Sequence, residues 1–187
     1  MSFNEILGEM IVNTSLVESV QYYEKRKVIL FEPQVSDSVV EILGIPSDSI
    51  VIKADNFPVP DRFFAGTKSE RKRADYIIIT QYKESFYSLF IEMKRGKKEE
   101  DYIINQLKGA LCLYKYIQAI GNIFWEDPNF LRDHSLRFIS LSKTSLSKKT
   151  TRPGRSSRAN GWHDTPENML KISGSRVIRF ENLLSRP

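Results

Sequence analysis

The chain has 187 residues and one cysteine, Cys112, which suits one domain with one core and excludes an internal disulfide. Hydrophobic residues make up 41% and charged residues 27% of the chain, as in ordinary globular proteins. No apolar run approaches the roughly 20 residues that cross a bilayer, and the acidic N-terminus lacks the basic flank of a secretory signal. We therefore expect a cytoplasmic protein that does not contact a membrane. Its net charge of +5 fits a polyanionic partner without establishing one.

The N-terminal segment is expected to be mostly helical. Apolar residues recur at helical spacing through residues 3–26. Ser15 and Glu18 have the form of a capping box, which predicts an interruption and a new helix start there.

Two strands and a solvated connection are expected next. Residues 28–35 and 49–54 are short apolar stretches typical of strands. Residues 55–74 contain Pro58, Pro60, a glycine and a basic run, which indicates a turn-rich connection.

The middle of the chain predicts a hairpin, a long helix and a further strand. Residues 75–81 and 86–94 are apolar and β-branched, with a polar break at 82–85. Residues 99–121 carry acids in the first turn and a glycine at the end, as helices do, and 136–142 predict another strand. The fold class is therefore α/β: a central mixed sheet flanked by helices, with the element order α-β-β-β-α-β.

The C-terminal part is unusually basic. Residues 143–163 contain no acid and predict a basic loop, followed by a short helix that starts at Thr165 and a strand over 176–180 at a sheet edge. We divide the single domain into a core, 1–142, and a basic extension, 143–187. The residues of the loop that we expect to contact nucleic-acid phosphates are Lys148, Lys149, Arg152, Arg155 and Arg158.

Two charged residues stand inside the second strand of the hairpin. Glu92 and Lys94 are two residues apart, so they point to the same face, and their neighbours are apolar, as in a central strand. A hairpin centred on Lys83-Glu84 pairs residues whose numbers sum to about 167, which places Asp75 opposite Glu92. Two carboxylates that close repel unless a cation lies between them, and oxygen ligands of this kind suit Mg²⁺ or Mn²⁺.

Asp75 and the Glu92-Met93-Lys94 triplet resemble the active-site motif of the PD-(D/E)XK nuclease superfamily, whose members have the restriction-endonuclease-like fold. The motif places an acid at the start of one strand and an acid-x-lysine on the next. Ala74 stands where the motif has its proline, a position that varies in the superfamily. The resemblance extends in element order over most of the predicted core.

This resemblance implies a metal-dependent endonuclease that hydrolyses DNA phosphodiester bonds and leaves a 5′-phosphate. Asp75 and Glu92 would hold Mg²⁺ or Mn²⁺, helped by the Met93 carbonyl. Lys94 would position or activate the attacking water and offset developing negative charge. The resemblance leaves open whether one or two metal ions bind.

Two auxiliary residues follow from the same resemblance. Gln106 lies near the start of the long helix, where many superfamily members carry a glutamine or lysine that reaches the active site. Ala110 replaces the tyrosine that exonuclease-type members carry four residues later. Glu18 lies on the predicted first helix, from which a glutamate completes the metal site in some resolvases and restriction enzymes. A capping role for Glu18 explains its position equally well.

A function of a different class also fits the sequence. The chain could keep the nuclease fold as a non-catalytic nucleic-acid-binding or assembly module. No motif supports an enzyme that acts on an unrelated substrate, because the sequence has no phosphate loop, dinucleotide fingerprint or nucleophile motif. The sequence does not determine whether the substrate is DNA or RNA, which site is cleaved, which biological pathway is served or what the oligomeric state is. A homodimer is compatible with it.

Overall fold

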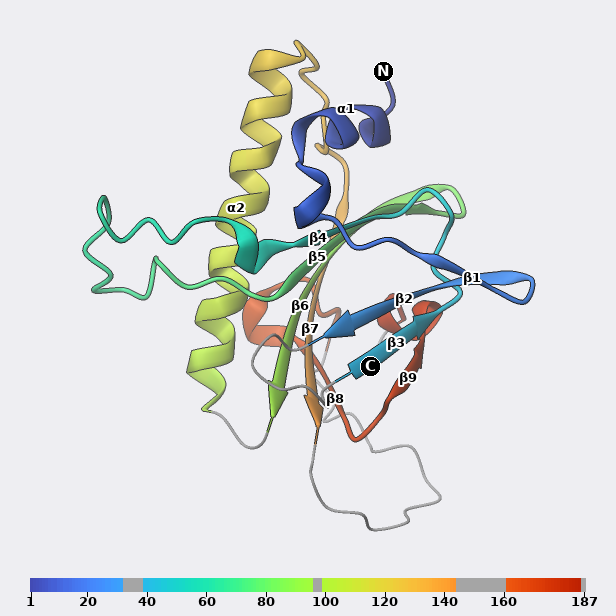
Figure 1. The fold of residues 1–187 in the computed structure, drawn as a ribbon. Coiled ribbons are helices and arrows are strands. Elements are labelled where there is room, and N and C mark those ends of the chain that lie inside the picture. The colour runs from blue at the N-terminus through green and yellow to red at the C-terminus, as the bar shows by residue number, and fades with distance from the viewer. Residues whose placement is uncertain (32–38, 96–98, 144–160, 186–187) are drawn as a thin grey trace.

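The computed structural model describes residues 1–31, 39–95, 99–143 and 161–185 (Figure 1). These residues form a mixed α/β structure with two mixed sheets and two α-helices. No helix in the described residues is both long enough and apolar enough to cross a membrane. The fold class predicted from the sequence is therefore correct at this level, although the chain divides its strands between two sheets where one was expected.

The larger sheet contains the predicted hairpin at its centre. Its strand order is β4-β5-β6-β7-β8, antiparallel from β4 to β6 and parallel from β6 to β8. Tyr76 pairs with Ile91 and Tyr82 with Ser85, so the numbers of paired residues sum to 167 and the predicted register is confirmed. The strands are β4 (Ile50–Lys53), β5 (Tyr76–Tyr82), β6 (Ser85–Arg95), β7 (Ser135–Lys143) and β8 (Leu170–Ser173).

The smaller sheet has the strand order β1-β2-β3-β9, with β9 parallel to β3 and the other pairs antiparallel. It corrects the prediction of helix through residue 26, because Val20–Tyr22 instead pairs with Lys25–Lys27 in a hairpin. The sequence pattern did not predict β3. The strands are β1 (Val20–Tyr22), β2 (Lys25–Phe31), β3 (Val39–Leu43) and β9 (Val177–Arg179).

The first helix, α1, spans only Phe3–Met10. Its capping box is formed by Ser2 and Glu5, so the capping box predicted at Ser15 is wrong. Ser15 instead ends a 3₁₀ turn. The second helix, α2, spans Glu100–Phe124 and confirms the predicted long helix.

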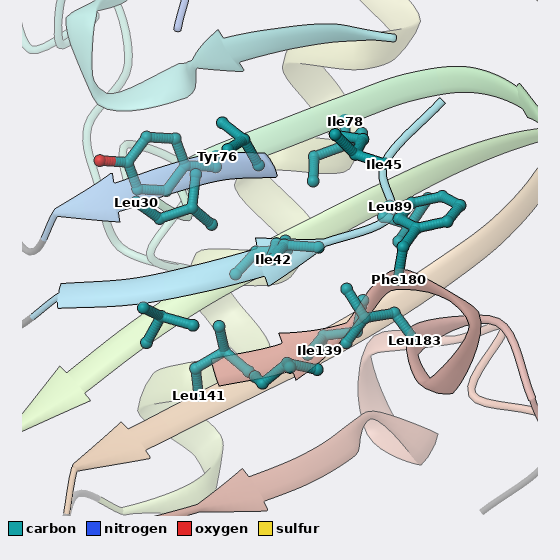
Figure 2. Close-up of a cluster of buried hydrophobic side chains, with 14 of the residues drawn as sticks. Leu30, Ile42, Ile45, Tyr76, Ile78, Leu89, Ile139, Leu141, Phe180 and Leu183 are labelled. Atoms are coloured by element: carbon teal, nitrogen blue, oxygen red, sulfur yellow. The ribbon is translucent and has the colours of Figure 1, made fainter. Parts of the chain in front are cut away.

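The larger sheet is the middle layer of the structure. The two α-helices lie against one of its faces, and the smaller sheet lies against the other (Figure 1). Because side chains alternate along a strand, each central strand contributes to two cores. Residues such as Ile77 and Phe90 pack under the helices, whereas Ile78 and Leu89 face the smaller sheet. Figure 2 shows the core between the sheets, where Tyr76 lies near Leu30.

The C-terminal residues are integrated into both sheets. Thr165 caps a 3₁₀ turn over Pro166–Asn168, where a short helix was expected, and β8 follows it at one edge of the larger sheet. The strand predicted over 176–180 is present as β9 at an edge of the smaller sheet. The basic-loop residues Lys148, Lys149, Arg152, Arg155 and Arg158 lie outside the described residues.

Candidate active site

Asp75, Glu92 and Lys94 lie together at one end of the central hairpin. Asp75 directly precedes β5, and the other two lie near the end of β6. Glu92 and Lys94 follow Phe90 at two-residue steps, so all three side chains project toward α2. Glu92 is fully buried, with 0% of its surface exposed. The structure thus brings together the three residues that the sequence motif named.

Backbone contacts fix the position of Asp75. Its Oδ2 accepts a hydrogen bond of 2.6 Å from the Met93 backbone N–H. Its own carbonyl accepts a 2.8 Å hydrogen bond from the N–H of Ala54, beyond the end of β4. The N–H and C=O of a strand residue point to the same side of the strand, so the Met93 carbonyl also points toward Asp75. The Asp75 and Glu92 carboxylates and the Met93 carbonyl therefore lie together at this end of the hairpin.

Glu92 has an unusual electrostatic environment. Burial and the nearby Asp75 carboxylate raise the pKa of Glu92 to about 8, against an ordinary value of 4.5. The Lys94 ammonium forms an ion pair with Glu92 that offsets part of this cost. Burial works to lower the pKa of Lys94, but attraction to Glu92 and Asp75 is stronger and the pKa is raised. Glu92 is the strained member of the group, and Lys94 stays charged at neutral pH.

The two carboxylates and the backbone oxygen are hard donors of the kind that Mg²⁺ and Mn²⁺ prefer. Neither oxygen of the Glu92 carboxylate accepts a well-aligned hydrogen bond within the described residues, apart from the ion-pair contact of Oε1 with Lys94. The Glu92 carboxylate, which also interacts with the Asp75 backbone, lies buried beside a second carboxylate, an arrangement that a bound Mg²⁺ or Mn²⁺ would stabilise. The described residues contain no cluster of three or more histidine, cysteine or acidic side chains suited to a metal. The candidate ligands are therefore Asp75, Glu92 and the Met93 carbonyl.

Gln106 contacts the candidate site through the segment before Asp75. Its Oε1 accepts a 3.0 Å hydrogen bond from the Arg73 backbone N–H, and its Nε2 donates a 3.2 Å hydrogen bond to the Tyr102 hydroxyl. The Lys94 ammonium lies 4.9 Å from the centroid of the Tyr102 ring. Gln106 is thus within the network around Lys94, but both ends of its amide are engaged by protein groups.

A stripe on α2 supports this segment. Tyr102, Gln106 and Gly109 lie four and three residues apart, so they share one face of the helix. A Cβ atom built on Gly109 would lie 1.6 Å from the Lys72 carbonyl oxygen, so the chain leading to Asp75 crosses α2 at this glycine. The Lys72 ammonium lies 5.1 Å from the Tyr102 ring centroid. Sequence reasoning missed Tyr102 and Gly109, for which the helical spacing from Gln106 was the available signal.

Glu18 is not part of this group. It is exposed and lies between the 3₁₀ turn and β1, so its assignment to a helix is wrong. Leu16 forms an antiparallel bridge with Ile52, so Glu18 lies level with Ile50 of β4. Ile50 in turn pairs with Ile79 of β5. That level is four residues along β5 from Asp75, about 13 Å at the rise of a strand. Glu18 therefore does not complete the carboxylate pair.

A polar row continues from Glu92 across the sheet. The parallel register places Ser140 of β7 beside Glu92, and Lys171 of β8 beside Ser140, all on the helix-facing side. Lys171 forms a 2.6 Å ion pair with Glu100 in the first turn of α2. Lys171 and Lys72 are the described cations that flank the candidate site on either side of the hairpin.

Comparison of the chain with protein-family models, with curated protein sequences and with solved structures found no match. Asp75, Glu92 and Lys94, through their motif and their geometry, are therefore the features of the chain that point to a function.

Proposed function

We propose that the protein is a metal-dependent DNA endonuclease of the PD-(D/E)XK type, with a restriction-endonuclease-like core. The observation that carries this proposal is the buried Glu92 carboxylate, held against Asp75 and Lys94 at the end of two paired strands. Burying such a group lowers stability, so packing alone does not favour it. The succession of an antiparallel hairpin, a long helix and a strand parallel to β6 also supports the proposed core.

The chain's own residues would divide the chemistry among them. A Mg²⁺ or Mn²⁺ held by Asp75, Glu92 and the Met93 carbonyl would supply an acidified water and stabilise charge on the phosphate. Lys94 remains protonated beside this position, where it would orient the water and offset the developing negative charge. Asp75 keeps its orientation because its Oδ2 is bound by the Met93 N–H.

The Lys94→Ala variant tests the proposal most directly. We expect purified wild-type protein to nick supercoiled plasmid only when Mg²⁺ or Mn²⁺ is present, and the variant to lose this activity while its circular dichroism spectrum shows that it remains folded. Lys83→Ala is the matched control, because Lys83 lies in the turn at the opposite end of the hairpin. Wild-type rates in Lys94→Ala would contradict the assignment.

The same assay separates the second function left open by the sequence. If the wild-type protein binds DNA but shows no cleavage with either cation, the fold serves a non-catalytic nucleic-acid-binding or assembly module. A melting temperature raised by Mg²⁺ in the wild type would show that a cation binds the folded state. The Lys94→Ala variant should retain that rise, because Lys94 is not a ligand.

A further inference from the structure

A hollow of about 890 Å³ lies at the tip of the β1–β2 hairpin, away from the candidate active site. Tyr22 and Tyr23 of the hairpin and Tyr82 at the end of β5 contribute aromatic rings to its lining. Tyr82 and Asp75 are at opposite ends of β5, about 23 Å apart at the rise of a strand. Figure 1 shows this hairpin projecting away from the first turn of α2. The hollow is thus a separate surface.

Tyr23 has a conformation that folding alone does not favour. Tyr22 pairs with Lys25, so Tyr23 and Glu24 form a two-residue hairpin loop. Tyr23 has a φ of 52°, and 86% of its surface is exposed. Two-residue loops usually place asparagine, aspartate or glycine at positive φ, because bulkier residues are strained there. Lys83 has the same conformation (φ 56°) at the first loop position of the β5–β6 hairpin, so the positive φ does not by itself assign a function. What distinguishes Tyr23 is an aromatic ring that is exposed to a ligand.

The three tyrosines offer ring surface to the hollow. Tyr22 and Tyr23 contact each other edge to face, with 4.9 Å between ring centroids, and Tyr22 is 41% exposed. Tyr82 is held from behind by Phe180, also edge to face, at 5.5 Å. In each edge-to-face pair one ring covers part of the other, and the ammonium groups of Lys27 and Lys83 lie over the Tyr22 and Tyr82 rings, at 4.7 Å and 5.6 Å from their centroids. The ring of Tyr23, 86% exposed, is therefore the main surface on which a base can stack.

Cations lie next to the rings. Lys25 forms no ion pair with any residue in the described part of the chain, and Arg179 has only a 3.6 Å contact with Glu181 while remaining largely exposed. Arg26 also lines the hollow, although Ser19 engages its guanidinium. Glu24 and Glu181 also line the hollow, so its three cations exceed its carboxylates by one. An exposed ring beside exposed cations complements a ligand in which planar bases alternate with phosphates.

We propose that this hollow binds single-stranded nucleic acid, with a base stacked on Tyr23 and phosphates held by Lys25 and Arg179. The nucleic acid would bind at a surface that is separate from the Asp75 and Glu92 carboxylates. This binding needs no metal ion and is separate from cleavage.

The test is fluorescence anisotropy with a fluorescein-labelled deoxythymidine strand of about twelve nucleotides, within the span of known single-strand grooves. EDTA is present throughout, so cleavage cannot contribute. We expect Tyr23→Asn to weaken binding about tenfold, because a stacked base is lost. The melting temperature should stay the same or rise, because asparagine tolerates positive φ. Phe63→Ala is the matched control, since Phe63 is equally exposed (85%) but does not line the hollow.

Salt dependence tests the cations independently. In the Lys25→Ala/Arg179→Ala double variant, the slope of log affinity against log salt should flatten by about 0.7 for each phosphate that is no longer neutralised. Unchanged affinity in Tyr23→Asn, an equal loss in Phe63→Ala or an absence of binding by the wild type would each overturn the proposal. The binding assay contains EDTA and no cleavage step, so failure of the nuclease assignment in the plasmid assay and failure of this site give different results.

Discussion

The two faces of β6 show what packing dictates and what it does not. On the face toward the smaller sheet, Ile91 and Met93 are buried among apolar side chains from both sheets. On the face toward α2, Phe90 belongs to an equally apolar core. The next two residues on that face, Glu92 and Lys94, are charged and form an ion pair. The same strand therefore carries one uniform face and one that changes from apolar to ionic. The change occurs where α2 begins and Asp75 enters the sheet.

The ionic end depends on support from α2, and the apolar face does not. The segment before Asp75 is fixed by Gln106 and by its close passage over Gly109. The apolar face is fixed by many interchangeable contacts, each of which is small. Substitutions on α2 should therefore disturb the candidate active site selectively, unless they also prevent docking of the helix.

The largest expected effect is that of Gly109→Ala. A methyl group 1.6 Å from the Lys72 carbonyl forces the helix and the segment apart, so we expect a loss of more than about 4 kcal/mol or no folded protein. Urea denaturation followed by circular dichroism measures it. Gly8→Ala is the control: a methyl group at Gly8 would meet no atom within 4 Å, and alanine should stabilise α1 by about 0.5–1 kcal/mol.

A similar loss in both glycine variants would show that the two helices are generally intolerant of alanine. The close passage at Gly109 would then not be the cause, and the comparison between the two faces of β6 would lose its structural basis.

The second effect concerns the pH dependence of stability. The pKa of Glu92 is about 8 in the folded state against 4.5 ordinarily, so the folded state binds more protons between these values and its stability falls as pH rises from 4.5 to 8. A pKa change of this size corresponds to a free energy of about 5 kcal/mol. Glu92→Gln removes the titrating group, so the variant should gain stability relative to the wild type as pH rises through this window.

The measurement is the difference in unfolding free energy between Glu92→Gln and wild type across that pH range, with EDTA present. The difference reports Glu92 together with its partners Asp75 and Lys94, and it cancels the contribution of His134, which is the same in both proteins. Burial lowers the pKa of His134 to about 4, which makes stability rise with pH and opposes the trend of Glu92. A difference that does not change with pH would contradict the raised pKa of Glu92.

The sequence predicted the hairpin and the carboxylate pair correctly because both depend on local rules. Two apolar stretches around a short polar break determine an antiparallel register, and the register places Asp75 next to Glu92. The β1–β2 hairpin escaped prediction for the opposite reason. Val17 and Val20 have helical spacing, but pairing of Val20–Tyr22 with β2 and then β3 overrides it. Glu18 was consequently assigned to a helix that does not extend to it.

The third effect is smaller and concerns Gln106. Gln106→Ala removes the hydrogen bonds to Arg73 and to Tyr102, which should cost about 1–3 kcal/mol because the Arg73 N–H loses its acceptor. If Gln106 acts by positioning Asp75, the variant should bind Mn²⁺ more weakly in a calorimetric titration. Gln118→Ala is a control on the same helix, since Gln118 also bonds a backbone group, the Phe130 carbonyl, but far from Asp75.

The smallest expected effect is that of Glu18→Gln, which separates a carboxylate near the site from those within it. Glu18 is exposed and lies about 13 Å along β5 from Asp75, so its removal should change the unfolding free energy by less than about 0.5 kcal/mol. The rise in melting temperature caused by Mg²⁺ should equal that of the wild type.

Asp75→Asn is the matched comparison. Its amide oxygen can still accept from the Met93 N–H, so the fold should persist while the Mg²⁺ response is reduced. A reduced Mg²⁺ response in Glu18→Gln would mean that the N-terminal segment moves toward the hairpin when a cation binds, and the two-carboxylate site would then be incomplete.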